Sequence, residues 1–277
     1  LAAGGRRVDT SLKYYHDLAG VGWAINNSTV PREDIFVTSK VDDPYGFNTT
    51  LAHFDELLQV LNSSYVDLLL IHWPGPTYFL GHKAPNSSLF CHAHGPTCRQ
   101  QTWMALEEIF HSGRARAIGV ANFEQRHVQD ILDLGSGHLV PAVNQLEFHP
   151  YWQETGYHEW LANMSITLNS YAPLGAPDFM GWHPEKWPVL IPNQPIVKEI
   201  AANVSRTPAQ VLLQWNLQRG AVINPRTNKP AHMAENLALF GADAFKLSQP
   251  QMNAITNMPN VPPAGFNKVC PDPNLVP

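Results

Sequence analysis

The chain has 277 residues, of which 44% are hydrophobic and 15% are charged, and its formal net charge is -5. This composition is typical of a folded protein with a sizeable core and excludes an intrinsically disordered chain. The charges are scattered without a basic run, which excludes nucleic acid and an anionic membrane surface as expected partners. No apolar run approaches the roughly 20 residues that span a bilayer, and the opening residues LAAGGRRVD lack the apolar stretch of a secretory signal.

Short β-rich runs recur along the chain with helical stretches between them. Taken in chain order, strands are expected at residues 6–10, 35–39, 66–71, 115–120, 143–147, 166–171 and 221–224. Segments 50–61 and 207–218 carry apolar residues at helical spacing, and Thr207 followed by Pro208 resembles an N-cap and a first helical position. Alternating strands and helices predict a parallel sheet of the α/β class.

The sheet is expected to close into a (β/α)₈ TIM barrel rather than to stay open. An open doubly wound sheet would accommodate the visible strands, but no strand is followed by a Gly-rich GxGxxG phosphate loop. A barrel needs eight strands, so we expect an N-terminal strand and helix to be absent from this chain. We predict one barrel domain over residues 1–258, with a Pro-rich tail, residues 259–277, packed on it.

Two long stretches, 74–99 and 175–195, each follow a predicted strand at its carboxyl end and are expected to be irregular. Such loops are natural walls for a substrate pocket on that face of a barrel. They and their edges hold aromatic side chains, from which we select as pocket residues Trp73, Tyr78 and Trp182. The alternative is that these aromatic rings only anchor long loops.

Cys91 and Cys98 bracket a short loop, CHAHGPTC, in which a local disulfide would close easily, leaving Cys270 unpaired. The alternative is a metal site that also uses His92 and His94, but the spacing is not that of zinc sites, and we expect no metal.

Glycosylation sequons are frequent in the chain, and we expect glycans at Asn27, Asn48, Asn62, Asn86, Asn163 and Asn203. With the disulfide, they favour a secreted protein or one in the secretory lumen. The alternative is a cytoplasmic protein with an Asn-rich surface.

Polar residues gather where three successive predicted strands end, in the strings VDTSLKYY, VTSK and LLLIHWP. The carboxyl ends of barrel strands share one face, which is the catalytic one, so Asp9, Tyr14, Lys40 and His72 are expected to converge there. Each residue alone has a simpler explanation: a cap, a core aromatic, a solvated lysine and a satisfied histidine. Their joint position is what favours a catalytic site.

These strings resemble the aldo-keto reductase family, over nearly the whole chain from Gly5 to about Leu247. The resemblance implies hydride transfer from a nicotinamide to a carbonyl carbon, with Tyr14 as the proton donor to the oxygen. A free phenol has a pKa near 10 and is a weak acid, so a nearby cation must stabilise its anion, and Lys40 would supply it. Asp9 would hold Lys40, and His72 would orient the carbonyl.

The resemblance also implies nicotinamide contacts. In GVANF, Asn122 matches a carboxamide contact, although Ala121 stands where the family has a serine. Gln145, in NQLEFHP, matches the second carboxamide contact. In SYAPLG, Tyr171 matches the ring that stacks on the nicotinamide, and Leu174 lies nearby.

The segment INPRTNKPAHMAEN resembles the family's clamp on the adenosine half of the cofactor. Arg226 and Thr227 match the contacts to the 2′-phosphate, and Glu235 and Asn236 match those to the adenine. His232 stands where the family often has an arginine, which weakens the expected preference for NADPH over NADH. The alternative is that the basic residues here only solvate a loop.

The expected function is therefore NADPH-dependent reduction of an aldehyde or ketone, with NADH as a possible cofactor and a small carbonyl compound as substrate. The chain is expected to be a monomer or to form an assembly that the sequence does not identify. A rival interpretation is a secreted, glycosylated barrel that keeps the four residues and serves as a binding or assembly component; the absent strand and the sequons favour it, while the intact four residues oppose it.

Overall fold

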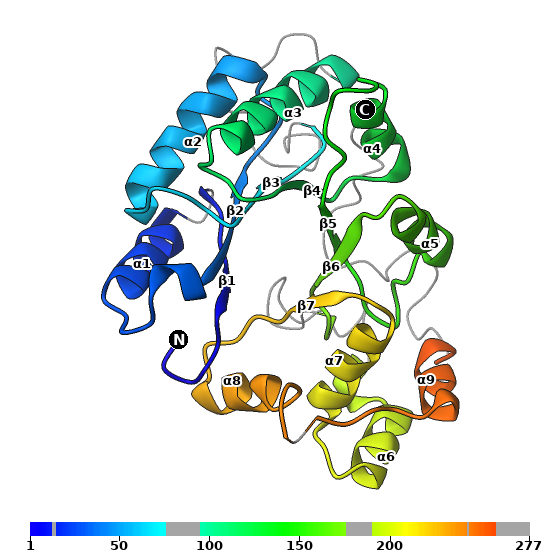
Figure 1. The fold of residues 1–277 in the computed structure, drawn as a ribbon. Helices are drawn as coiled ribbons and strands as arrows, with labels where there is room; N and C mark the ends of the chain where they lie inside the picture. The colour runs from blue at the N-terminus through cyan, green and yellow to red at the C-terminus, as the bar shows by residue number, and fades with distance from the viewer. Residues whose placement is uncertain (13–14, 76–94, 176–189, 243, 259–277) are drawn as a thin grey trace. The chain divides into compact units, whose positions relative to one another are not determined.

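The computed structural model describes residues 1–12, 15–75, 95–175, 190–242 and 244–258 (Figure 1). The chain divides into two compact units, Leu1–Asn144 and Gln145–Pro271. No helix within the described ranges is long and apolar enough to cross a membrane. The predicted tail, residues 259–277, lies outside these ranges, so its packing stays a prediction.

The strands of the described residues coincide with the runs that the sequence predicts: β1 Arg7–Asp9, β2 Phe36–Val41, β3 Leu68–Ile71, β4 Ile118–Ala121, β5 Val143–Glu147, β6 Thr167–Tyr171 and β7 Val222–Asn224. They form one seven-stranded sheet in sequence order. The β1–β2, β2–β3, β3–β4 and β6–β7 pairs are parallel. The expected parallel sheet is confirmed. Strands β3 and β4 are buried throughout and consist mainly of apolar residues, as is typical of a parallel strand covered on both faces.

In the first unit the register aligns the ends of the strands. Asp9 lies opposite Thr38, and Thr38 lies opposite Leu68, so the residues that follow each strand emerge at the same edge. The backbones at Gly119 and Val143 approach each other closely, because an added Cβ at Gly119 would lie 2.5 Å from the carbonyl oxygen of Val143. The strand centre therefore requires glycine there.

The helices of the first unit are α1 Tyr15–Asn26, α2 Phe47–Leu61, α3 Pro96–His111 and α4 Gln125–Leu132, with a 3₁₀ turn at Arg32–Asp34. Each of the four contacts its neighbour in chain order, and together they lie along the outer side of β1–β4 (Figure 1). Phe54 and Leu57 of α2 and Trp103 of α3 are fully buried. This apolar layer fixes the strands whose ends carry the polar residues.

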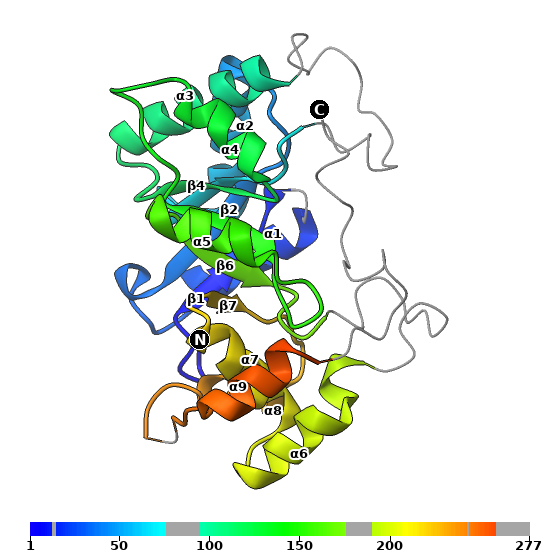
Figure 2. The same ribbon diagram turned by 90° about the vertical axis from the view of Figure 1, so that its right-hand side faces the viewer.

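In the second unit, β6 and β7 are aligned with Tyr171 opposite Asn224. The helices are α5 Thr155–Asn163, α6 Pro195–Asn203, α7 Pro208–Gln218, α8 Pro230–Leu237 and α9 Gln249–Thr256, with a 3₁₀ turn at Ile191–Asn193. Figure 2 shows α6, α7, α8 and α9 gathered together, and α7 contacts both α6 and α8. Thr207 caps α7 as predicted, because its hydroxyl accepts a hydrogen bond from the amide of Gln210.

The structure differs from the sequence prediction in three places. Helix α2 begins at Phe47, three residues before the expected start, after Gly46 with a φ of 83°. The stretch 74–99, expected to be irregular, becomes helical at Pro96, because proline suits a first helical turn. The stretch 175–195 likewise contains the 3₁₀ turn and the first residue of α6.

Candidate active site

Two of the four predicted catalytic residues meet at the ends of β1 and β2. The Lys40 side chain is 3% exposed and that of Asp9 is 12% exposed, and the ammonium Nζ donates a hydrogen bond to Asp9 Oδ1. Nζ also donates to the carbonyl oxygen of Thr10 at 3.1 Å. Because water is largely excluded, these two acceptors hold the Lys40 side chain in a fixed position.

His72 follows directly after β3 and is 8% exposed. Its amide donates to the carbonyl oxygen of Val41 at 2.8 Å, and its own carbonyl accepts from Asn122 Nδ2 at 2.9 Å. Asn122, 4% exposed, has a φ of 59°, a left-handed conformation that asparagine tolerates better than most residues. The structure thus brings a predicted catalytic residue and a predicted cofactor contact together.

Sequence reasoning missed Asp42, a polar neighbour of His72, and Ser11, which contacts Asp42. Asp42 Oδ1 lies 3.6 Å from His72 Nδ1 and accepts a hydrogen bond from Ser11 Oγ at 3.2 Å. The amide of Trp73 donates to the Asp42 carbonyl oxygen at 3.2 Å. The signal in the sequence is the pair of acidic residues two and three positions after Lys40, in SKVDD.

The carboxylates after β2 make the local potential negative. Burial, followed by the charges of Asp43 and Asp42, raises the pKa of Tyr45 above its ordinary value. This phenol is therefore a weaker acid than a free tyrosine.

Some predicted residues cannot be placed. Tyr14, Tyr78 and Trp182 lie outside the described residues. Trp73 is described: it is 8% exposed, and its ring centroid lies 6.2 Å from that of His72. Trp73, predicted to line the substrate pocket, therefore lies beside His72, predicted to be the catalytic histidine.

In the second unit, the predicted nicotinamide contacts lie on two strands. Gln145, on β5, is 4% exposed. Tyr171 ends β6 and is half-buried, and its carbonyl oxygen accepts from the Phe148 amide at 3.3 Å. Leu174 follows three residues later and is half-buried too. A buried carboxamide offers both a donor and an acceptor to a primary amide, so Gln145 suits the nicotinamide contact predicted for it.

The predicted adenosine contacts follow β7. Arg226 is exposed, and the Thr227 hydroxyl accepts from the Lys229 amide at 3.1 Å and lies 3.4 Å from His232 Nδ1. This combination of a guanidinium, a lysine, a hydroxyl and an imidazole suits a phosphate group.

Glu235 and Asn236 are half-buried on α8. The Glu235 carboxylate accepts a hydrogen bond from the Thr207 hydroxyl at 3.2 Å. That bond fixes the orientation of one of the two predicted adenine contacts.

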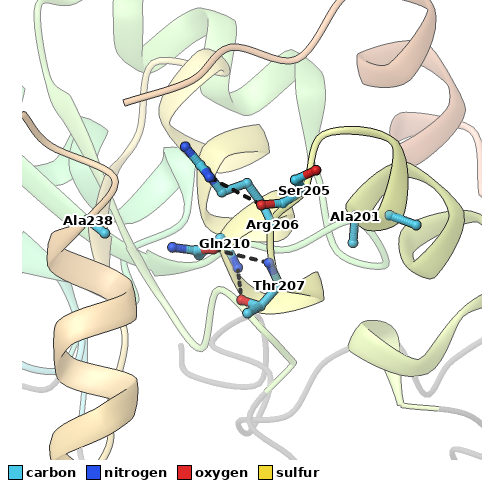
Figure 3. A pocket seen from close by; sticks show the side chains of 7 residues that line it. Ala201, Ser205, Arg206, Thr207, Gln210 and Ala238 are labelled. Atoms are coloured by element: carbon cyan, nitrogen blue, oxygen red, sulfur yellow. Dashed lines mark hydrogen bonds between the residues drawn. The ribbon is translucent and has the colours of Figure 1, made fainter. Parts of the chain in front are cut away.

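A groove of about 450 Å³ in the second unit lies at the junction of α6, α7 and α8 (Figure 3), and it is lined by Ala201, Ala202, Ser205, Arg206, Thr207, Gln210 and Ala238. None of the predicted site residues lines it. Its polar groups bond to one another: Arg206 donates to the Ser205 carbonyl at 3.1 Å, and the Gln210 amide donates to the Thr207 hydroxyl at 3.2 Å. The groove is therefore not assigned as the active site.

Comparison with known proteins identifies relatives over most of the chain. The model of the aldo/keto reductase family matches residues 1–259. The 9,11-endoperoxide prostaglandin H2 reductase of Trypanosoma cruzi is 33% identical over 259 residues, covering 93% of this chain and 79% of that protein. The glyoxal reductase of Bacillus subtilis is 34% identical over 253 residues, covering 91% and 78%.

Solved structures resemble the fold as well. An aldo/keto reductase from Brucella melitensis superposes with a TM-score of 0.74 at 31% identity, covering 92% of this chain and 84% of that one. A variant of Gox0644 in complex with NADPH gives a TM-score of 0.77 at 32% identity, covering 99% and 85%. The prediction of a (β/α)₈ barrel is confirmed by these similarities.

The interpretation as a secreted, disulfide-bonded glycoprotein is corrected by the family match. The match concerns a family of reductases, and nothing in it supports glycosylation or secretion. The described sequon residues, Asn27, Asn48, Asn62, Asn163 and Asn203, are exposed, as asparagines commonly are, while Asn86 lies outside the described residues. The predicted disulfide is likewise unsupported: Cys98 is 3% exposed, and its predicted partner Cys91 lies outside the described residues.

The rival interpretation, a non-catalytic binding component, finds no support in these comparisons. The Lys40–Asp9 ion pair, the position of His72 and the family match agree in favouring carbonyl reduction with a nicotinamide cofactor. The chain belongs to the aldo/keto reductase family.

Proposed function

We propose that this chain reduces aldehydes or ketones with NADPH, with Tyr14 donating the proton and Lys40, Asp9 and His72 completing the catalytic group. The observation that carries the proposal is the buried Lys40 ammonium, bonded to Asp9 and to the Thr10 carbonyl. Nothing in a barrel core requires a buried cation at that position, whereas a reaction that develops negative charge on oxygen does.

The role of Lys40 follows from elementary electrostatics. Hydride transfer to a carbonyl carbon builds negative charge on the oxygen, and a proton donor within hydrogen-bond reach must neutralise it. An ammonium next to a phenol favours the phenolate and so makes the phenol a stronger acid. Asp9 keeps the ammonium in place, which supports Tyr14, five residues further along the chain, as the donor.

The cofactor supplies the hydride, and this chain supplies groups that suit its two ends. Asn122 and Gln145 would hold the nicotinamide carboxamide, with Tyr171 stacked on the ring and Leu174 beside it. Arg226 and Thr227 would hold the 2′-phosphate. The NADPH complex of a similar structure supports this choice of cofactor.

The preference for NADPH is tested by fluorescence titration of the full chain with NADPH and NADH. Losing Arg226 removes one cation that would face the 2′-phosphate, so Arg226→Ala should weaken NADPH binding about 10-fold and leave NADH binding within twofold. Lys198→Ala, an exposed cation on α6, is the matched control and should change neither affinity. Equal weakening for both cofactors would assign Arg226 no role at the phosphate.

Reduction itself is tested by NADPH consumption with small aldehydes and ketones. Turnover that requires both cofactor and carbonyl compound is the expected result. Tight NADPH binding without turnover on any carbonyl compound would contradict the proposed reaction while leaving the cofactor assignment intact.

A further inference from the structure

Asp42 lies beside the catalytic histidine but belongs to none of the roles assigned so far. Its Oδ1 is 3.6 Å from His72 Nδ1, which is within ion-pair range and slightly beyond a hydrogen bond. The side chains are 19% and 10% exposed, so water screens their interaction only in part. The arrangement makes the protonation of His72 sensitive to one nearby carboxylate.

Asp42 is itself held in place from two sides. Ser11 Oγ, fully buried after β1, donates to Asp42 Oδ1 at 3.2 Å. The backbone of Asp42 accepts from the amide of Trp73, the residue after His72, at 3.2 Å. Three neighbouring strand ends therefore fix the carboxylate relative to the imidazole.

We infer that Asp42 is a positioning residue, whose carboxylate stabilises His72 in its protonated form and holds its Nδ1 edge, so that Nε2–H serves as hydrogen-bond donor to the substrate carbonyl. The inference rests on the proposed function, in which His72 contacts that oxygen. A neutral imidazole carries one N–H, whereas the cation carries two. Only the cation can face Asp42 with one N–H and the carbonyl with the other.

The other charged groups at these strand ends do not replace Asp42. Lys40 and Asp9 are bonded to each other, and Asp43 acts on Tyr45 together with Asp42. Asp42 lies within ion-pair distance of His72. An opposite charge at this distance favours the protonated imidazole.

The test is the titration of the His72 ring nitrogens by NMR in ¹⁵N-histidine-labelled full-length protein, with His72→Gln to assign the signal. In Asp42→Asn the midpoint should fall by about one pH unit or more, because the amide has no charge. Asp133→Asn, which removes an exposed carboxylate at the end of α4, is the matched control and should leave the midpoint unchanged.

Kinetics provide the second measurement. Asp42→Asn should lower kcat at neutral pH about 10-fold, with the activity moving to lower pH, while the Kd for NADPH stays within twofold of the wild-type value. A purely structural role would move neither the titration nor the pH profile. If the Asp42 variants do not fold, Ser11→Ala, which releases the carboxylate, should shift the His72 midpoint in the same direction by a smaller amount.

An unchanged His72 midpoint in Asp42→Asn or in Ser11→Ala would overturn the inference. This result is distinguishable from failure of the proposed function, because the NMR titration needs no turnover. A shifted midpoint in a protein that reduces no carbonyl compound would instead leave the Asp42–His72 coupling in place and contradict the reaction.

Discussion

Lys40 donates a hydrogen bond from its ammonium to the carboxylate of Asp9, which joins the ends of two neighbouring strands by a buried ion pair. Breaking such a pair from one side leaves the other charge buried without its partner. The pair therefore couples the stability of the fold to the chemistry of the site.

A double-mutant cycle separates these two effects. Lys40→Met and Asp9→Asn should each lower the free energy of unfolding. For Lys40→Met the loss should be about 3–5 kcal/mol, because the Asp9 carboxylate is left without its partner. The double variant should lose less than the sum of the two, and urea denaturation measures all four proteins. Turnover should be lost in every variant without Lys40. Strict additivity of the stability changes would contradict the coupling.

Acid should destabilise the fold through His158. Burial, and secondarily the charge of Arg219, lowers its pKa to about 4, and its ring packs edge-on to Phe148 at 4.6 Å. Because the folded-state pKa lies below the unfolded value near 6.5, the unfolded chain binds the proton first, and stability falls as pH drops from about 6.5 to 4. The loss between pH 7 and 5 from this group is about 2 kcal/mol.

His158→Phe removes the titrating group and keeps an apolar ring. Its free energy of unfolding should change less between pH 7 and 5 than that of the wild-type protein, by about 2 kcal/mol, as measured by urea denaturation at both values. A variant with the same pH dependence as the wild type would show that His158 is protonated readily in the folded state.

Asp67 should matter more to stability than a surface carboxylate. It is 3% exposed and accepts from Arg32 at 2.9 Å, Arg116 at 3.0 Å and the Val37 amide at 2.9 Å. Asp67→Ala leaves the buried Val37 amide and the partly buried Arg32 guanidinium without this acceptor and should cost about 2–4 kcal/mol in thermal or urea unfolding. The matched control is Asp55→Ala, since Asp55 pairs with Arg114 while both are exposed, and its cost should stay below about 1 kcal/mol. Equal losses would contradict this ranking.

Two glycines that differ in their surroundings test the packing of β4. In Gly119→Ala the new Cβ would lie 2.5 Å from the Val143 carbonyl oxygen and 2.9 Å from Leu70 Cδ2, so the strands must separate, at a cost of about 1–3 kcal/mol. Gly156, on α5, has no atom within 4 Å of an added Cβ. Gly156→Ala should therefore be neutral or stabilise by up to about 1 kcal/mol. A reversed order of melting temperatures would contradict the close contact at Gly119.

The sequence predicts the strands better than the site. Strands such as Leu68–Ile71 are buried throughout, so their sequences are uninterrupted apolar runs that can be recognised without a structure. The position of α2 was less predictable, because Phe47 and Asn48 are exposed and carry no apolar signal for a helix start. The convergence of Lys40 and Asp9 could be predicted from their strand ends, and their pairing from the resemblance to the family.

Asp42 could not be assigned from the sequence. Its contact with His72 depends on how the backbone turns after β2, and Asp42 and His72 are 30 residues apart in the chain. The interpretation as a secreted glycoprotein failed for a different reason: a sequon requires only three residues, so an asparagine-rich surface produces it without any glycan.

The account depends most on a proton passing from Tyr14 to the substrate oxygen, and a single variant tests this most directly. Tyr14→Phe removes the donor and keeps the ring, so NADPH oxidation with a good aldehyde substrate should fall at least 100-fold while the Kd for NADPH, measured by fluorescence, stays within twofold. Retention of turnover near the wild-type rate, with cofactor binding intact, would contradict the assignment of the acid.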